Sequence, residues 1–221
     1  MDLTVSPFSD ASCDPPVRGF LHTPASLSGD ALGLTHGAGS DGSTPLLLRV
    51  AEAFAEAGAT VLRFDLPYRQ LRPHGPPRPG EAERDRAGIR NVVAALRNLG
   101  HRRVFLGGHS YGGRQSSMLV AAEPALVEGL LLLSYPLHPP RRPLQPRTAH
   151  FPELTAPVVF VHGSRDPFAT LAELETATHL IPAPTTLFPI EGAGHDLRAR
   201  TKEQGPSLLL LRDIARAVLG R

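Results

Sequence analysis

The chain lacks the features that mark secreted and membrane proteins. Cys13 is the one cysteine among 221 residues, so no disulfide can form within the chain and a reducing compartment is expected. No apolar run approaches the roughly 18 residues that a transmembrane helix needs. The N-terminal stretch MDLTVSPFSD has neither the basic nor the apolar segment of a secretory signal. The sequence therefore predicts a cytoplasmic protein that does not bind membranes.

Lysine is also nearly absent. Lys202 is the one lysine among 23 basic residues, and the formal net charge is only +2. The arginines are scattered, without a basic run or interleaved aromatic residues, so a nucleic-acid-binding surface is not expected. No pair of histidines has the spacing of metal ligands, and we expect neither a metal nor another cofactor. The arginine excess and the 23 prolines are explained most simply by a GC-rich genome.

Short apolar runs alternate with amphipathic helical patterns from residue 32 onward. The segment ALGLTHGAGS, residues 31–40, predicts a strand that ends in a glycine-rich loop. Further strands are predicted at 60–64, 103–106, 130–135, 157–163 and 185–190. Helices are predicted at 44–57, 81–99, 111–122, 168–180 and 206–219, the first two ended by Gly58 and Gly100. This order predicts an α/β fold, with a mostly parallel central sheet and helices on both faces.

Three segments do not follow this alternation. Residues 17–23 predict an additional antiparallel strand at the sheet edge. The Pro-rich stretches 66–80 and 136–152 are too short to be domains and are predicted to be loops. The chain is therefore expected to form one domain over residues 1–221, with its recognisable core at 32–219. Loops at the carboxyl ends of parallel strands surround the binding crevice of such sheets, and both Pro-rich loops follow strands.

The stretch GGHSYGGR, residues 107–114, lies between a predicted strand and a predicted helix. A strand, a Gly-x-Ser-x-Gly turn and a helix form the nucleophile elbow of hydrolases, in which the serine is held in a strained turn above the sheet. A small residue in a glycine-rich turn is the alternative explanation, but the strand before and the helix after favour Ser110 as a nucleophile.

A serine hydroxyl needs a base, and the base needs a group that orients it. In this fold the order along the chain is serine, acid, histidine. His195 follows the last predicted strand and Asp166 follows the strand before it, so these two residues are the predicted base and acid. Asp166 could instead cap the next helix, since Asp-Pro commonly opens one. For His36 the sequence favours a role in organising its loop.

Acyl transfer also needs donors for the developing oxyanion. One N–H is expected from Tyr111, which follows the nucleophile, and the other from the loop His36–Ser40. Ala38 is the predicted donor there, with Gly37 next. A phosphate-binding loop is the weaker interpretation because neither a Walker lysine nor a complete GxGxxG is present.

Five motifs resemble, in order, those of the α/β-hydrolases: THGAGS, FDLPY, GGHSYGGR, HGSRDPF and GAGH. The residues 64–68 and Arg114 are similar to those of small lid-less hydrolases related to testis-expressed protein 30, and more distantly of dienelactone hydrolases. The resemblance implies an α/β-hydrolase fold with Ser110, Asp166 and His195 as a catalytic triad. Dienelactone hydrolases use a cysteine nucleophile and haloalkane dehalogenases an aspartate, so the serine disfavours both of those chemistries.

The connection 136–152 is short where capped α/β-hydrolases insert a helical cap, so we expect no large cap and a shallow, accessible site. Candidates for substrate contact are His36, Tyr68, Arg114 and Phe168. Arginines of the two Pro-rich stretches could favour an anionic substrate, although solvated surface arginines are the simpler interpretation. These arginines are Arg69, Arg72, Arg141, Arg142 and Arg147.

The main hypothesis is a serine hydrolase that cleaves carboxylic ester or thioester bonds of a small acyl substrate through an acyl-enzyme. A peptidase or an acyltransferase would use the same first half-reaction, so the sequence does not separate them. A non-catalytic interaction module on a hydrolase fold is the alternative from another class. Nothing in the sequence distinguishes a monomer from a homodimer.

Overall fold

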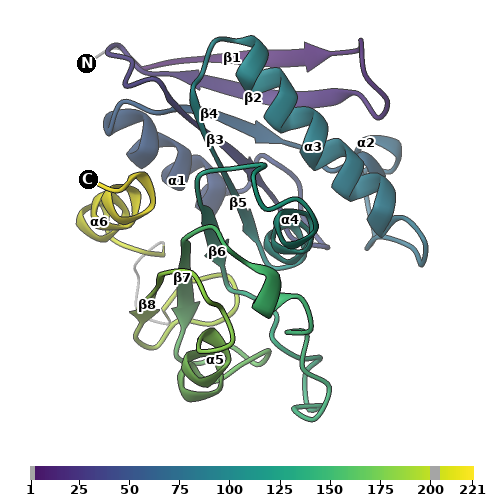
Figure 1. Cartoon of the computed structure of the whole chain (residues 1–221), viewed down its shortest axis with the longest axis vertical. Helices are drawn as coiled ribbons and strands as arrows, with labels where there is room; N and C mark the ends of the chain where they lie inside the picture. The colour runs from purple at the N-terminus through teal and green to yellow at the C-terminus, as the bar shows by residue number, and fades with distance from the viewer. Residues whose placement is uncertain (1–2, 200–204) are drawn as a thin grey trace.

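Apolar strands form the centre of a twisted sheet in this computed structural model, which describes residues 3–199 and 205–221 (Figure 1). Within these residues the sheet has eight strands in the order β1-β2-β4-β3-β5-β6-β7-β8. The strands β3 to β8 are parallel, whereas β2 pairs antiparallel with both β4 and β1. Their bounds are Thr4–Asp10, Val17–Thr23, Asp30–Thr35, Thr60–Phe64, Arg103–His109, Leu130–Leu133, Val158–Gly163 and Thr185–Ile190 for β1 to β8.

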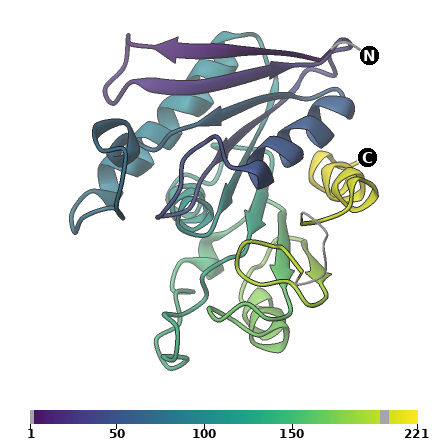
Figure 2. The ribbon, with the colours of Figure 1, turned by 180° about the vertical axis from the view of Figure 1, so that it is seen from behind.

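Helices cover both faces of the sheet, as the alternation of elements predicts. Figures 1 and 2 show α1 and α6 side by side on one face, with α3, α4 and α5 on the other. The bounds are Pro45–Glu56 for α1, Pro67–Leu71 for α2, Ala82–Asn98 for α3, Tyr111–Ala122 for α4, Leu171–Thr178 for α5 and Leu208–Leu219 for α6. None of the helices within residues 3–199 and 205–221 combines the length and apolar character needed to cross a bilayer.

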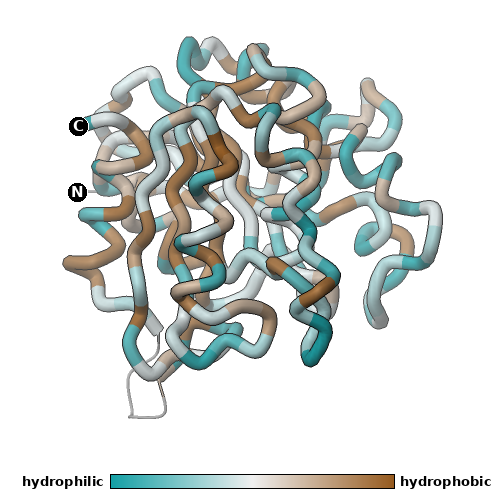
Figure 3. The backbone as a smooth tube through the Cα atoms, turned by 60° about the horizontal axis from the view of Figure 1, so that its bottom comes forward, coloured by the Kyte–Doolittle hydropathy of each residue, from teal (hydrophilic) through white to brown (hydrophobic). Residues whose placement is uncertain are grey.

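Successive residues of a strand supply the two cores alternately, because side chains along a strand point to opposite faces. In β6, Leu130 and Leu132 pack with the helices α3, α4 and α5, whereas Leu131 and Leu133 pack with α1 and α6. All four are buried, which explains why β6 is continuously apolar in sequence. The tube view of Figure 3 shows this hydrophobic colouring along the central strands.

The predicted α/β fold is confirmed, and the predicted helices and strands are present with ends that differ by up to three residues. Gly58 and Gly100 follow α1 and α3 with φ of +88° and +92°, the left-handed conformation that ends helices. Residues 17–23 form the predicted antiparallel strand, but the prediction that it lies at the edge is wrong. Strand β1 pairs with the outer side of β2, so β1 is the edge strand. Pro7 within β1 is tolerated at an edge because its missing N–H breaks no ladder there.

The prediction that residues 66–80 and 136–152 are loops is wrong in part. The first contains the helix α2, whose first residue is Pro67; proline is favoured at the start of a helix, where its missing N–H costs nothing. The second contains a single 3₁₀ turn, η1, at Phe151–Glu153. The stretch 136–152 otherwise has no regular structure and no cap, as predicted.

Replacing Leu132 with alanine tests the packing of the central strands. The side chain is fully buried in β6, so the change is expected to lower the free energy of unfolding by about 2–5 kcal/mol in a urea titration. Leu144→Ala is the matched control, because this leucine is 94% exposed and its loss should matter by less than about 0.5 kcal/mol. Equal stabilities of the two variants would contradict the described core.

Candidate active site

The turn between β5 and α4 holds Ser110 in a strained conformation. Its φ is 49° and its ψ is −113°, a region that residues other than glycine rarely adopt. The Ser110 N–H donates to the Leu133 carbonyl at 2.8 Å, and the Ser110 carbonyl accepts from the Arg114 N–H at 2.9 Å. These bonds tie the turn to β6 on one side and to the first turn of α4 on the other.

Two glycines of the motif are required by close backbone contacts. A Cβ on Gly108 would lie 2.4 Å from the Gly113 nitrogen, because β5 and α4 almost touch at the elbow. A Cβ on Gly112 would lie 2.5 Å from the His36 carbonyl oxygen, because α4 also touches the loop after β3. Side chains at either position would move the helix, and with it Ser110.

The structure brings together the three residues predicted from the order along the chain. Their strands are parallel, so the loops after β5, β7 and β8 lie at the same edge of the sheet. His195 Nε2 lies 2.8 Å from Ser110 Oγ, and His195 Nδ1 lies 2.7 Å from Asp166 Oδ2. The Asp166 side chain is fully buried, whereas the His195 side chain is 25% exposed. One partly exposed imidazole therefore connects a fully buried carboxylate with the hydroxyl of Ser110, which is itself only 9% exposed.

Asp166 does not cap the following helix, which was the alternative explanation for it. Its Oδ1 accepts the Phe168 N–H at 2.9 Å and closes a turn. The N-cap of α5 is Thr170, which forms a capping box with Glu173. The second oxygen of Asp166 remains directed at His195.

Two aromatic side chains fix the loop that carries His195. His109 Nε2 donates to the His195 carbonyl at 2.7 Å, so the residue before the serine also holds the loop of the histidine. Burial lowers the pKa of His109 to about 4, which leaves its ring neutral at pH 7. The Phe168 ring lies 4.3 Å from the His195 ring, centroid to centroid, and packs against it. His109 is thus structural.

The loop after β3 is held by side chains of the FDLPY motif and its neighbour. The Tyr68 hydroxyl lies 3.1 Å from the Gly37 carbonyl oxygen and 2.9 Å from that of Ala38. Arg69 Nε donates to the Ser40 carbonyl at 2.8 Å. These hydrogen bonds hold the carbonyl groups of the loop toward α2, and they fix the orientation of the loop backbone. Within the described residues, no hydrogen bond is donated by the N–H of Ala38 or of Tyr111.

A buried carboxylate that was not predicted from the sequence connects the predicted oxyanion residue Tyr111 with Tyr68, whose hydroxyl binds the Ala38 carbonyl. Asp85 of α3 is fully buried and accepts the Tyr111 hydroxyl at 2.8 Å and the Tyr68 N–H at 3.1 Å. Burial raises the pKa of Asp85, and these two hydrogen bonds oppose the rise. Its position in the helical repeat of α3 could have indicated that the Asp85 side chain is buried. Asp85 lies four residues before Ile89, on the face of α3 that carries Val92 and Leu96 into the core.

Two of the predicted substrate contacts are wrong. His36 is fully buried, with Nδ1 2.8 Å from the Gly37 carbonyl oxygen and Nε2 accepting the Leu66 N–H at 3.1 Å. Tyr68 is 1% exposed and bound to the same loop. Both side chains organise the loop and present no surface to a ligand. Phe168 lies beside His195, and its contact with substrate stays a prediction, as does that of Arg114.

The titratable side chains of this region do not resemble a metal site. Within residues 3–199 and 205–221, no three His, Cys, Asp or Glu side chains are grouped so that they could hold one ion. His162 approaches Asp166 to 3.8 Å, but its Nε2 lies 3.0 Å from the Ala169 carbonyl oxygen, to which it can donate. The hydrogen bonds of this region therefore join side chains to one another and to the backbone.

A mostly parallel sheet with a serine elbow, a histidine and a buried aspartate at its carboxyl edge defines the hydrolase class of α/β proteins. The family described as "Alpha/beta hydrolase domain" matches residues 29–219, and the chain belongs to this family. The family predicted from the motifs is thereby confirmed. The narrower likeness to relatives of testis-expressed protein 30 stays a prediction.

Solved structures share the fold at low sequence identity. A dienelactone hydrolase from Anabaena variabilis has a TM-score of 0.75 and 22% identity, over 100% of this chain and 98% of its own. Est1E from Butyrivibrio proteoclasticus has a TM-score of 0.73 and 17% identity, over 95% and 96%. A serine hydrolase without a lid from Xanthomonas campestris has a TM-score of 0.67 and 16% identity, over 98% and 93%. The coverage of 93% or more of both chains agrees with a fold that has no added cap domain.

Replacing Asp85 with asparagine tests the buried link between Tyr68 and Tyr111. The amide cannot accept from both donors as the carboxylate does, so we expect the free energy of unfolding to fall by about 1–3 kcal/mol in urea. Glu83→Gln removes the same charge from an exposed position of α3 and should change stability by less than about 0.5 kcal/mol. If the two variants were equally stable, Asp85 would not hold the tyrosines.

His109 predicts a dependence of stability on pH. Its folded-state pKa of about 4 lies below the usual 6.5, so between these values the unfolded chain binds a proton that the folded chain does not. The contribution of His109 is therefore complete above pH 6.5 and is lost as the pH falls toward 4.

The variant His109→Gln should lose this part of the pH dependence. In urea titrations at pH 4.5, 5.5 and 7, its stability is expected to fall less steeply than that of the wild type, by up to about 1.4 kcal/mol per pH unit. Parallel pH curves for the two proteins would show that His109 titrates as it does in the unfolded chain.

Proposed function

We propose that the protein is a serine hydrolase that cleaves carboxylic ester or thioester bonds of a small substrate through an acyl-enzyme. The observation that carries the proposal is the placement of His195 between Ser110 and Asp166, at 2.8 and 2.7 Å. Hydrogen bonds of this length allow the imidazole to take a proton from the hydroxyl while the carboxylate orients it.

In the first step, Ser110 Oγ attacks the carbonyl carbon of the substrate as its proton passes to His195 Nε2. Asp166 accepts the Nδ1–H of the ring, so it fixes the tautomer and stabilises the imidazolium. The strained turn keeps Oγ above the sheet and beside the histidine, so little ordering of the nucleophile remains to be done when substrate binds.

The negative charge that develops on the substrate oxygen is assigned to the N–H groups of Tyr111 and Ala38. The N-terminus of α4 adds its favourable dipole at the same point. Asp85 holds the Tyr111 side chain and the Tyr68 backbone, and the Tyr68 hydroxyl holds the Ala38 carbonyl. The two donors are thus oriented before substrate binds.

Collapse of the tetrahedral intermediate then breaks the bond to the alcohol or thiol. His195 returns its proton to this leaving group, and Ser110 carries the acyl group. Water, activated by the same histidine, attacks the acyl-enzyme in the second half-reaction and releases the acid. The absence of a cap over residues 136–152 favours access of water, and therefore hydrolysis over transfer to another alcohol.

Names of the structural neighbours support ester chemistry. One is a dienelactone hydrolase, and a lactone is a cyclic ester; another is named as a serine hydrolase without a lid. Est1E has also been solved with ferulic acid bound, which is a carboxylic acid. Peptidase and acyltransferase activities share the acyl-enzyme and are distinguished by the substrates that release it.

Labelling by a fluorophosphonate tests the nucleophile directly. Intact mass of the wild type should rise by one adduct, because an activated serine attacks phosphorus as it attacks an acyl carbon. Ser110→Ala should gain none, and should lower kcat for 4-nitrophenyl acetate by on the order of 10⁴-fold or more.

Ser116→Ala is the matched control on the same helix. Ser116 is buried and its hydroxyl has no hydrogen-bond partner within the described residues, so its loss should leave labelling and hydrolysis unchanged. An unlabelled but folded wild type would contradict the proposal and favour the interaction module. A labelled wild type that hydrolyses peptides and not esters would favour the peptidase.

A further inference from the structure

The five arginines named above from the Pro-rich stretches have different surroundings. Arg69 is buried and donates to backbone carbonyls, and Arg72 pairs with Glu81 at 2.6 Å. Arg141 and Arg142 are exposed. Arg69 uses all three guanidinium nitrogens to bind backbone carbonyls. Arg147 is partly buried, and within the described residues its side chain donates only to the Pro136 carbonyl, at 3.3 Å.

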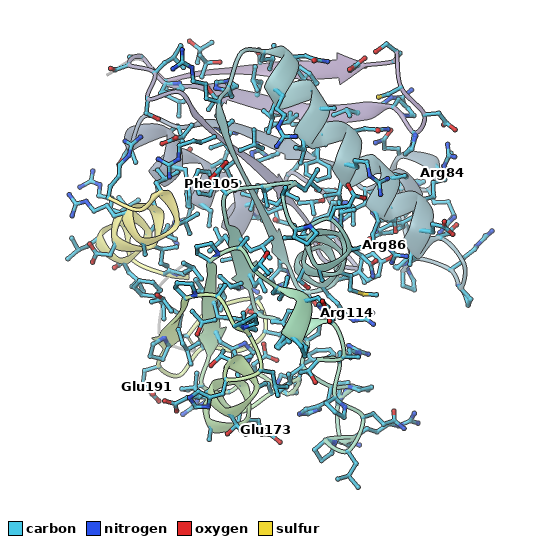
Figure 4. The ribbon with its side chains drawn as sticks, in the orientation of Figure 1. Arg84, Arg86, Phe105, Arg114, Glu173 and Glu191 are labelled. Atoms are coloured by element: carbon cyan, nitrogen blue, oxygen red, sulfur yellow. The ribbon has the colours of Figure 1, made fainter. Side chains whose placement is uncertain are left out.

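Arg147 faces a second arginine, Arg114 of α4. Burial first, and then the positive charge of Arg114, lower the pKa of Arg147. The Nε of Arg114 is buried and has no hydrogen-bond partner within the described residues. Figure 4 shows Arg114 close to η1, at the end of the connection 136–152 that carries Arg147.

The other polar groups around the two arginines are neutral. Burial first, and then Arg114, lower the pKa of His150 to about 4, so this ring carries no charge at pH 7. Burial raises the pKa of Tyr135, which donates its hydroxyl to the Arg147 carbonyl at 2.7 Å. No carboxylate among residues 3–199 and 205–221 pairs with Arg114 or Arg147. Two like charges are thus held together without a counter-charge from the part of the chain that the structure describes.

The pair lies close to the nucleophile. Arg114 lies in the first turn of α4, about 6 Å along the axis from Ser110, and its N–H donates to the Ser110 carbonyl at 2.9 Å. Side chains of a helix lean toward its N-terminus, which here is the end that carries Ser110. Arg147 donates to the Leu137 and Pro136 carbonyls, just after the strand β6 that accepts the Ser110 N–H.

We propose that Arg114 and Arg147 bind an anionic group, a carboxylate or phosphate, on the acyl part of the substrate. The inference rests on the proposed serine hydrolase and names its substrate class. A bound anion would supply the missing counter-charge, and the guanidinium groups suit the oxygens of a carboxylate or phosphate. The anion would sit one helical turn from the acyl carbon that Ser110 attacks.

Two esters with acyl chains of equal length test the substrate class: 4-nitrophenyl hemiglutarate, which is anionic, and 4-nitrophenyl pentanoate, which is neutral. We expect the wild type to prefer the anionic ester. Arg114→Gln and Arg147→Gln should each lower kcat/KM for that ester by about 10- to 100-fold, the effect of a lost hydrogen bond to a charged group. The neutral ester should change by less than about two-fold, and Arg114→Lys should restore part of the preference.

Arg142→Gln removes the same charge from an exposed position of the same connection and is the matched control. It should leave the preference intact. An equal loss in Arg142→Gln would show long-range attraction without a site, and equal losses on both esters would show that Arg114 is only structural. Either result, or a wild type without preference, overturns the proposal.

Binding without turnover separates this inference from the proposed function. Glutarate or inorganic phosphate should raise the melting temperature of Ser110→Ala but not of the double variant Ser110→Ala/Arg114→Gln. Stabilisation by only one of the two anions identifies which group the arginines take. Stabilisation with no ester hydrolysis by the wild type would keep the anion site and reject the hydrolase. Hydrolysis of the neutral ester with no stabilisation by either anion would keep the hydrolase and reject the anion site.

Discussion

The close backbone contact between β5 and α4 is the constraint on which the site depends. Only glycine at position 108 lets the helix begin directly above the strand, and the contact turns Ser110 into a conformation that costs free energy. The cost is offset by the surrounding sheet, since the Ser110 N–H is bound to β6. The parallel strands then bring the loops after β7 and β8 to the same edge. The sheet therefore brings Asp166 and His195 to this edge, where local contacts such as that of His109 with the His195 carbonyl fix their loops.

Buried polar side chains orient the backbone around this contact. Asp85 binds both Tyr111 and the start of α2, the Tyr68 hydroxyl binds the loop after β3, and His109 binds the loop after β8. Each loop that approaches Ser110 is thus tied to an element outside it. Such bonds are worth more in a dry interior than at the surface, and a missing partner is correspondingly costly. The rigidity of the site therefore comes from a polar network beneath it.

Much of this architecture was predictable because it is local or periodic in sequence. Apolar runs and helical spacing predicted the sheet and its helices. Ser110, Asp166 and His195 each follow a parallel strand, and this predicted that they meet at one edge of the sheet. The strand β1 was missed because its sequence, TVSPFSD, is mostly polar and contains a proline, and its pairing with β2 makes it a strand. The roles of Asp85 and Tyr68 depend on contacts between α3, α4 and the loop after β3. No linear pattern contains those contacts, although the helical phase of Asp85 pointed to its burial.

The distribution of charge around the site bears on what an uncapped hydrolase can bind. Without a cap, little apolar surface of a small substrate can be buried, so charged groups must supply more of the orientation. His109 and His150 are neutral at pH 7, and the carboxylate that binds the nucleophile's histidine, Asp166, is buried. The positive charges of Arg114 and Arg147, which form the proposed anion site, then have no carboxylate partner among the described residues. Because that charge lies on the helix that positions Ser110, substrate recognition and the nucleophile would share one rigid element.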